Sequence, residues 1–576
     1  MVSMFIRPIY VRKNGKRHAY WALVKSERTE RGPRQRVVAY LGQMDNRGRL
    51  AMKRAAEQTD GAQLELYEED GPPEWVEVDL KGVRTENRRA FGGVWLGREL
   101  MRQLGLIDFL HAAIPPGRED VPWPAMALIL VLSRLCKPSS ELAIAEAHYE
   151  SCAMADLLGV PSEKVNDDRL YRALDALLPY KAQLEVHLKG RLGELFGLKY
   201  DLLLYDVTST YFEGEAAAND LAAYGYSRDK RPDCKQVCIA LVVSRCGMPF
   251  GYEVFAGNTG DSTTVQQIVV TMESRYGSAE RIWIMDRGMV SRENLDFLQT
   301  SGRRYIIGTP RSMLKSYERQ LVDGTWQAIR AGLEVMLCPS PDGSETFILC
   351  RSTDRREKEK AMHARFEKRI EAGLARIAQG CDSRRQTATA VAERVGRLMQ
   401  QNTRAAAMFS WSVSDNDGRA TLTWSKNEAK RQWATLSEGC YLLRSNVTDW
   451  SAQELWNAYM QLTEAEAAFR IQKSDLRIRP IWHQKTGRVH AHILVCFLAY
   501  VLWKTLAQLC KRAGLGDEPR RIFAALAEIA SVDVVLPTRD GRTIRTRCIV
   551  RPTDHQQILL EHLKLRLPSR LRIHDM

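Results

Sequence analysis

The sequence predicts an α/β protein whose mixed β-sheet is interrupted by a long inserted segment and preceded by a small β-sheet and a helical region. From residue 197, apolar strand-like runs alternate with helix-like segments. About 140 residues after Pro310 break this rhythm, and the first 42 residues show strand-like alternation. A chain of 576 residues that is 45% hydrophobic is too long for one ordinary core and can bury several.

The N-terminal segment, residues 1–70, reads as a three-stranded antiparallel meander followed by a linker. Its strands are MFIRPIYVRK, HAYWALVKS and QRVVAYLG, with a hairpin turn at Asn14 and Gly15 and a Gly-Pro break before the third strand. The acidic, proline-containing stretch LYEEDGPPEW is typical of a linker.

Residues 85–196 carry apolar side chains at three- and four-residue spacing, which predicts helices. Asn166 is placed to cap the helix DDRLYRALDALLPY. This helical region is either a DNA-binding domain or a scaffold, since no recognition-helix signature decides between them.

Residues 197–312 form the first part of the predicted sheet. The strand-like segments are KYDLLLYDVTSTYFEG, KQVCIALVVSRCG, MPFGYEVFAG, RIWIMDRG and RYIIGTP, and the helix-like ones are TTVQQIVVTMESRYG and SRENLDFLQTSG. Three strands, then helix, strand, helix and strand, is the order typical of the ribonuclease H-like fold, whose later connections are right-handed crossovers.

Residues 313–450 read as an inserted domain. It combines strand-like runs, a charged helical pair and a hairpin around Asp417 and Gly418. One apolar stripe on the first helix indicates packing rather than a cofactor site: Phe366, Ile370, Leu374 and Ile377. The core resumes in residues 451–510, and residues 511–576 form a C-terminal extension with one more hairpin and a basic terminus.

The formal net charge of +14 favours a polyanionic partner, although a solvated basic face explains it equally well.

The most closely spaced cysteines are Cys234, Cys238 and Cys246. They lie in an apolar stretch without a histidine cluster, so buried thiols are favoured over zinc. The N-terminus lacks a signal-like apolar region, and the apolar runs 125–132 and 493–503 are too short to cross a bilayer. We therefore expect a cytoplasmic, nucleoid-associated protein without membrane contact.

Two carboxylates follow predicted buried strands. Asp206 ends the run LLLY and Asp286 ends IWIM, so both would lie at the carboxyl edge of the sheet. Either aspartate alone could simply cap a turn. Together they would repel one another unless a cation lay between them, and Mg²⁺ or Mn²⁺ prefers such oxygen ligands.

A third carboxylate, Glu466, belongs to the segment YMQLTEAEAAFRIQK. If this segment forms one helix, Tyr459, Leu462, Glu466, Arg470 and Lys473 share a face, whereas Glu464 points elsewhere as a solvated charge. An ordinary amphipathic helix would show the same stripe.

These residues resemble the DDE transposases of bacterial insertion sequences, in the branch with a large β-rich insertion before the catalytic glutamate. That branch carries the signature Tyr, two residues, Arg, three residues, Glu, six residues, Lys. Here Tyr459, Glu466 and Lys473 match, and Leu462 replaces the arginine. The segments YDVTSTYFEG, FAGNTGDSTT, MDRG, LRIRPIWH and AHILVCFLAYVLW also match, within residues 197–312 and 451–505.

The resemblance implies that Asp206, Asp286 and Glu466 are the catalytic residues and hold two Mg²⁺ or Mn²⁺ ions for DNA cleavage and strand transfer. It implies duplex DNA as partner, both transposon-end inverted repeats and target, and a homodimer on that DNA. With the neighbouring positive charges, the candidate DNA contacts are Arg287, Tyr459, Arg470, Lys473, Arg477, Arg479 and His483. An alternative without DNA contact is that the run RIRPIWH is simply a basic loop at a helix end.

Two other functions remain open at this point. A structure-selective nuclease of the same fold would use the same metal ligands without joining DNA. A non-catalytic DNA-binding protein descended from a transposase would need neither metal nor carboxylates, so three retained carboxylates speak against it.

Overall fold

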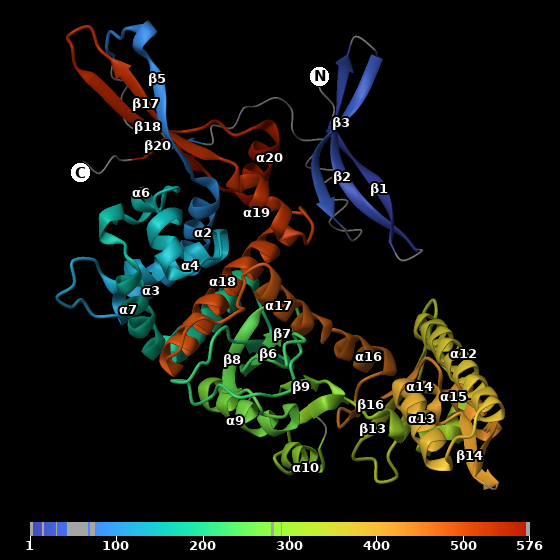
Figure 1. Ribbon diagram of the computed structural model, residues 1–576. Helices are drawn as coiled ribbons and strands as arrows, with labels where there is room; N and C mark the ends of the chain where they lie inside the picture. The colour runs from blue at the N-terminus through green and yellow to red at the C-terminus, as the bar shows by residue number, and fades with distance from the viewer. Residues whose placement is uncertain are drawn as a thin grey trace.

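The computed structural model describes residues 4–13, 16–29, 32–42, 67–68, 75–277, 281–289, 291–416 and 418–571 (Figure 1). The predicted turn at Asn14 and Gly15, most of the acidic linker, Asp417 and the last five residues lie outside these ranges. Within them the chain is a mixed α/β protein built around one large sheet.

The large sheet has nine strands in the order β11-β12-β13-β16-β10-β9-β6-β7-β8. The half that holds the two aspartates follows the predicted order. β6 pairs parallel with β9, β9 pairs parallel with β10, and β7 runs antiparallel to β6 and β8. These strands are β6 (Leu202–Tyr211), β7 (Gln236–Ser244), β8 (Pro249–Ala256), β9 (Ile282–Met285) and β10 (Arg304–Gly308).

The other half of the sheet comes from the segment interpreted as an insertion. β16 (Cys440–Ser445) pairs antiparallel with β10 on one side and with β13 (Thr346–Ser352) on the other, and β12 (Leu333–Pro339) and β11 (Gln327–Arg330) complete the edge. Strands expected in a separate domain therefore continue the core sheet. An unpaired β10 would expose a row of backbone groups, and β16 covers them.

The two faces of the sheet have separate cores. Alternate side chains of a strand point to opposite faces. Tyr205 and Trp283 pack with α9 (Val265–Tyr276) and α10 (Arg292–Thr300) on one face, whereas Leu204 and Ile284 belong to the large core under α17 (Thr463–Ser474) and α18 (Thr486–Arg512) on the other. Burial on both faces explains why these strands read as continuous apolar runs.

The predicted helical region consists of short helices around α4, joined by a π-helical stretch at Ile144–His148. The Asn166 side chain accepts a hydrogen bond from the Arg169 amide at 2.9 Å, so the predicted cap is confirmed. The helices are α2 (Gly92–Gln103), α3 (Leu106–Ala113), α4 (Trp123–Cys136), α5 (Glu141–Ala143), α6 (Met154–Leu158), α7 (Asp167–Leu177) and α8 (Lys181–Phe196).

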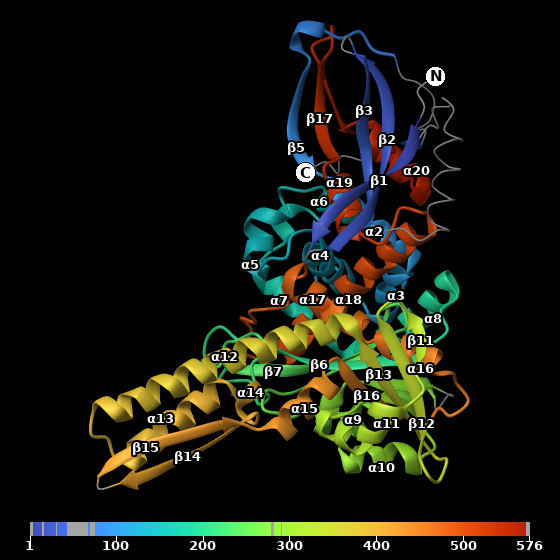
Figure 2. The ribbon, with the colours of Figure 1, turned by 90° about the vertical axis from the view of Figure 1, so that its right-hand side faces the viewer.

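Beyond β13 the chain forms an arm that extends away from the sheet (Figure 2). Ile370, Leu374 and Ile377 are buried in the arm's own core, as the apolar stripe predicted. The arm contains α12 (Thr353–Ser383), α13 (Ala388–Gln401), α14 (Thr403–Ala406), β14 (Phe409–Asn416), β15 (Arg419–Lys426) and α15 (Glu428–Ser437), and α11 (Glu318–Asp323) precedes it.

A three-stranded and a four-stranded sheet lie outside the large sheet and the arm. β1 (Met4–Lys13), β2 (Lys16–Thr29) and β3 (Gly32–Gly42) form the predicted meander. The predicted C-terminal hairpin is β17 (Ala530–Pro537) and β18 (Thr543–Ile549), flanked by β5 (Arg84–Ala90) and β20 (Arg570–Leu571). The remaining elements are α16 (Ala452–Met460), α19 (Pro519–Ala527), α20 (Asp554–Leu563), and the paired short strands β4 (Tyr67–Glu68) and β19 (Leu567–Pro568).

Helix α18 is longer than the apolar run 493–503 suggested. Its 27 residues are long and apolar enough to cross a membrane by length and composition, so the expectation that this run is too short was wrong. However, 78% of its most apolar stretch is buried by the protein itself, against α4, α7 and α17. Helix α18 is thus the central core helix of this fold. All twelve cysteines are free. Of the three closely spaced ones, Cys238 is buried as expected, whereas Cys234 and Cys246 are half-buried.

Candidate active site

Asp206 and Asp286 lie side by side where β9 ends. Asp286 directly follows β9, but Asp206 lies within β6, which continues to Tyr211, so the expectation that Asp206 ends its strand was wrong. β6 and β9 are parallel, and Tyr205 pairs with Met285, so each aspartate is the residue that follows one of this pair. Both follow residues that face α9, and alternation therefore directs them to the other face, where α17 and α18 lie. The predicted proximity of the two aspartates is thus present in the register of the strands.

Asp206 is the more enclosed of the two carboxylates. Burial raises its pKa to about 7, and the negative charges of Asp286 and Glu466 act in the same direction. The Val207 amide, which donates to Asp206 Oδ1 at 2.8 Å, and the Arg228 guanidinium oppose the shift. Asp286 and Glu466 are therefore both close enough to Asp206 to act on it electrostatically.

Glu466 reaches this site from α17, which packs against β6 and β7. The expected single helix from Tyr459 to Lys473 is in fact two helices: α16 ends at Met460 and α17 begins at Thr463. Between them the amides of Leu462 and Glu464 bond to carbonyls only three residues back, which tightens the chain into a turn. The predicted common stripe is thus broken at Leu462, whose side chain is buried.

The two glutamates of α17 have different surroundings. Glu464 pairs with Lys504 of α18 at 3.2 Å, so it is an ion-paired residue rather than the purely solvated charge that was expected. Glu466 is exposed and lines a cavity together with Asp286. The preference for Glu466 over Glu464 as a site residue agrees with this arrangement.

The cavity has a volume of about 600 Å³ and lies where the core strands meet the inserted segment. Its charged lining comprises three carboxylates, Asp286, Glu359 and Glu466, and five arginines. The arginines are Arg287, Arg311, Arg330, Arg355 and Arg404, and aromatic or apolar side chains include Tyr441, Trp456, Tyr459 and Leu462. Only Arg287 of these arginines was among the predicted site residues. The other four were missed because they are scattered through a segment whose packing the sequence does not specify.

Tyr459 of α16 points its hydroxyl at the site. Its Oη donates to Asp286 Oδ1 at 3.3 Å, and burial followed by the charge of Asp286 raises the pKa of Tyr459 far above its ordinary value. The phenol therefore stays protonated and remains a donor. Of the predicted DNA-contact residues, Tyr459 and Arg287 are the two that line the cavity.

The other predicted DNA contacts lie along α17 and the segment after it. Arg470 and Arg477 have exposed side chains. Lys473 pairs with Asp229 at 2.9 Å, and Arg479 pairs with the same carboxylate. Asp229 comes from the long β6–β7 connection and is almost fully buried, and sequence reasoning missed it because nothing local marks it as a partner of Lys473.

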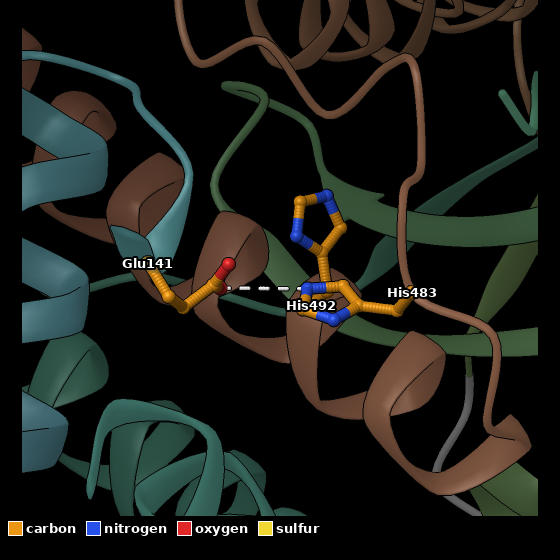
Figure 3. Close-up of side chains that lie close together, drawn as sticks. All are labelled: Glu141, His483 and His492. Atoms are coloured by element: carbon orange, nitrogen blue, oxygen red, sulfur yellow. Dashed lines mark ion pairs between the residues drawn. The ribbon is translucent and has the colours of Figure 1, made fainter. Parts of the chain in front are cut away.

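His483 is buried, not on a DNA-facing surface. Its Nε2 lies 3.4 Å from Glu141 Oε1, and the His492 ring lies beside it (Figure 3). Burial would raise the pKa of Glu141, but the hydrogen bond and charge of His483 outweigh it and lower the pKa to about 2. Burial and the charge of Arg134, whose Nη2 lies 3.4 Å from His492 Nδ1, lower the pKa of His492 to about 3.

The buried cluster at His483 and the three predicted catalytic carboxylates differ in how closely their possible metal-ligand atoms are spaced. One ligand atom each from Glu141, His483 and His492 lies within 4.8 Å of the other two, and within the described ranges no other trio of His, Cys, Asp and Glu does so. Asp206, Asp286 and Glu466 are thus grouped more loosely. The tighter cluster, however, already contains Arg134, whose guanidinium supplies the positive charge that a cation would otherwise bring.

Comparison with known proteins gives two matches to family models. Residues 197–502 match the transposase DDE domain, and residues 6–68 match the N-terminal domain of the IS1634 family of transposases. Among solved structures, the chain is similar to a piggyBac transposase synaptic complex with hairpin DNA, at 9% identity and a TM-score of 0.35, over 79% of this chain and 82% of that one. No curated protein sequence matches the chain.

The DDE-domain match begins just before β6 and ends within α18, so it spans both aspartates, Glu466 and the whole inserted segment, more than half of the chain. On this evidence the protein belongs to the transposases with a DDE domain, and its N-terminal segment is similar to that of the IS1634 family.

Proposed function

We propose that this protein cuts DNA at the ends of an insertion sequence and joins those ends to a target, with Asp206, Asp286 and Glu466 as metal-binding catalytic residues. The catalytic core would be ribonuclease H-like, consisting of residues 197–312 and 451–510. The strand order β8-β7-β6-β9-β10, with β6, β9 and β10 parallel, supports this assignment. Residues 313–450 would be the insertion, although their strands extend the same sheet.

The observation that carries the proposal is the convergence of three carboxylates from distant parts of the chain. Asp206 and Asp286 occupy neighbouring positions in register, and the pKa of Asp206 responds to both Asp286 and Glu466. Among the described residues, none of the three carboxylates has an ion-pair partner within 4 Å. Carboxylates gathered without such partners indicate a binding site for cations rather than a structural salt bridge.

The oxygen ligands that these three side chains offer suit hard divalent cations. All three side chains offer carboxylate oxygens, which Mg²⁺ and Mn²⁺ prefer. Burial raises the pKa of Asp206, so a bound cation would stabilise its charged form. Two bound ions would activate the attacking oxygen and stabilise the leaving oxygen of an in-line displacement at phosphorus. Tyr459 would hold Asp286 in place through its hydroxyl, and no covalent protein intermediate is needed.

DNA contact would involve Arg287 and Tyr459 in the cavity and Arg470, Lys473, Arg477 and Arg479 along α17 and its continuation. His483 is left out because its side chain is buried.

We further propose a homodimer on DNA, because two ends must be cut together, and a nucleoid-associated location in the cytoplasm. The helical region, residues 85–196, and the N-terminal meander are candidates for reading the terminal repeats.

The test is cleavage of a duplex that carries the inverted repeats flanking the coding region, with and without Mg²⁺. Asp206→Asn, Asp286→Asn and Glu466→Gln should each abolish cleavage and leave binding of the duplex largely intact. Loss of a direct metal ligand should cost more than the roughly 10- to 100-fold typical of outer-sphere changes. Glu464→Gln is the matched control, because Glu464 lies on the same helix and pairs with Lys504 instead.

Full cleavage by any of the three variants would refute the site assignment. The same assay separates the rival functions. A structure-selective nuclease would cut DNA junctions and form no joined product. A non-catalytic DNA-binding protein would bind the duplex and show no heat of Mn²⁺ binding in calorimetry.

A further inference from the structure

The cavity beside the candidate active site has an unusual division of charge along the chain. Asp286 and Glu466 come from the core, whereas Arg330, Arg355 and Arg404 come from β11, α12 and α14 of the inserted segment. We call these three residues the insertion arginines. A single cavity therefore joins two predicted catalytic carboxylates to cations contributed by a segment whose role the sequence left open.

The charge of the lining favours an anion. Five arginines face three carboxylates, and two of these carboxylates are the proposed metal ligands. When divalent cations neutralise those two, the surplus positive charge of the cavity grows. A polyanion such as a DNA strand would neutralise it, and arginine is the residue best suited to bind phosphate oxygens in pairs.

The insertion arginines differ in how they are held. Arg355 pairs with Glu359 at 3.1 Å, and Glu359 also pairs with Arg311 at 3.1 Å and accepts the Gly439 amide at 3.0 Å. Glu359 thus orients two arginines at once. Such an anchored guanidinium loses little further freedom when it binds a phosphate.

Arg330 and Arg404 have no carboxylate partner within 4 Å in the part of the chain that the structure describes. Arg330 lies over the Trp456 ring, with its guanidinium carbon 5.0 Å from the centroid, and Arg404 Nη1 donates to the Met362 sulfur at 3.7 Å. Both residues are exposed. Exposed arginines without a carboxylate, at the rim of a site that already holds an anchored one, are available to an incoming anion.

We propose that the inserted segment acts as a phosphate clamp: Arg330, Arg355 and Arg404 bind backbone phosphates of the DNA strand whose scissile phosphate lies at Asp286 and Glu466. The clamp rests on the proposed function, because it assumes that DNA enters this cavity. It assigns the insertion a direct part in holding the substrate, with Glu359 as the residue that positions Arg355.

The test compares two triple variants with the same loss of charge. In one, Arg330, Arg355 and Arg404 are changed to Ala. In the matched control, Arg376, Arg384 and Arg385 are changed to Ala, since these exposed arginines belong to the same segment but do not line the cavity. Binding of a short fluorescent duplex is measured without divalent metal over a series of salt concentrations.

Each lost phosphate contact should reduce the slope of log affinity against log salt by about 0.9, so the clamp variant should lose up to about three units of slope. The control variant should keep the slope of the native chain. Replacing the same three arginines with Lys should restore most of the slope, because charge is kept, but not cleavage at the native rate, because the paired geometry is lost. An unchanged slope in the clamp variant, or an equal drop in the control, would overturn the proposal.

Thermal unfolding of each variant shows whether it is folded. If the triple variant does not fold, Arg330→Ala and Arg404→Ala, both at exposed positions, are tested singly for a loss of about one unit of slope each. Failure of the clamp and failure of the proposed function give different results. If the native chain cuts DNA but the clamp variant keeps its slope, only the clamp is wrong, and if the native chain does not cut, the proposed function is wrong whatever the slope.

Discussion

The cavity at Asp286 and the buried cluster at His483 are both made of titratable side chains drawn from distant segments, but they are partnered in opposite ways. Within the described chain, Asp286 and Glu466 have no cationic partner and open onto a cavity. Glu141, His483 and His492 are enclosed, and each contacts a group that satisfies it, with Arg134 completing the charge. The comparison shows that incomplete partnering, more than close spacing, marks a group that is available for chemistry.

The comparison first predicts that the buried cluster matters for stability and not for catalysis. Glu141→Ala leaves His483 without its partner, and removal of one member of a buried pair should lower the free energy of unfolding by about 3 kcal/mol. Urea denaturation measures this loss. Glu146→Ala, at a nearby exposed position, should stay within about 0.5 kcal/mol of the native chain.

Cleavage per folded molecule should be unchanged in Glu141→Ala at a temperature where it is folded. A loss of cleavage as large as that of Asp286→Asn, without a loss of stability, would mean that the cluster takes part in the reaction.

The second prediction concerns pH. The pKa of His492 is lowered to about 3 in the folded protein from an ordinary value of 6.5. At pH values between these two, His492 is protonated in the unfolded chain and neutral in the folded chain. Stability contributed by neutral His492 is fully present above pH 6.5 and is lost as the pH falls toward 3. The part of the loss that His492 contributes between pH 7 and pH 5 should be about 2 kcal/mol.

Glu141, whose pKa is lowered to about 2, adds to the acid sensitivity only below about pH 4.5. Denaturation midpoints at pH 7, 6 and 5 therefore exclude Glu141, but burial also lowers the pKa of other histidines, among them His148 to about 4, so a variant of His492 is needed. His492→Gln, which keeps a donor for the Ile478 carbonyl, should flatten this dependence, and an unchanged pH dependence in that variant would assign it to other groups.

The smallest expected effect is at Tyr459. Tyr459→Phe removes one long hydrogen bond to Asp286 and leaves the ring in place, so cleavage should slow by about fivefold or less. Single-turnover cleavage rates measure this. A loss as large as that of Asp286→Asn would show that the hydroxyl does more than orient the carboxylate.

The positions of Asp206 and Asp286 could be predicted from the sequence because each follows a run of strand-forming apolar residues, and the parallel register then aligns them. The break between α16 and α17 could not be predicted, because the turn at Gln461 and Leu462 contains neither glycine nor proline. The burial of His483 could not be predicted from the sequence either. It depends on Glu141, which lies far away in the sequence and reaches His483 only through the packing of the helical region against the core.

The pairing of β16 with both β10 and β13 limits how the protein can move. A hinge between the two halves of the sheet would have to break the continuous pairing of β10, β16 and β13, which ties the core to the inserted strands. The arm leaves the sheet between β13 and β16, so opening for a bulky substrate is expected where the arm joins these strands, whereas Arg330 on β11 stays fixed to the sheet that carries the aspartates.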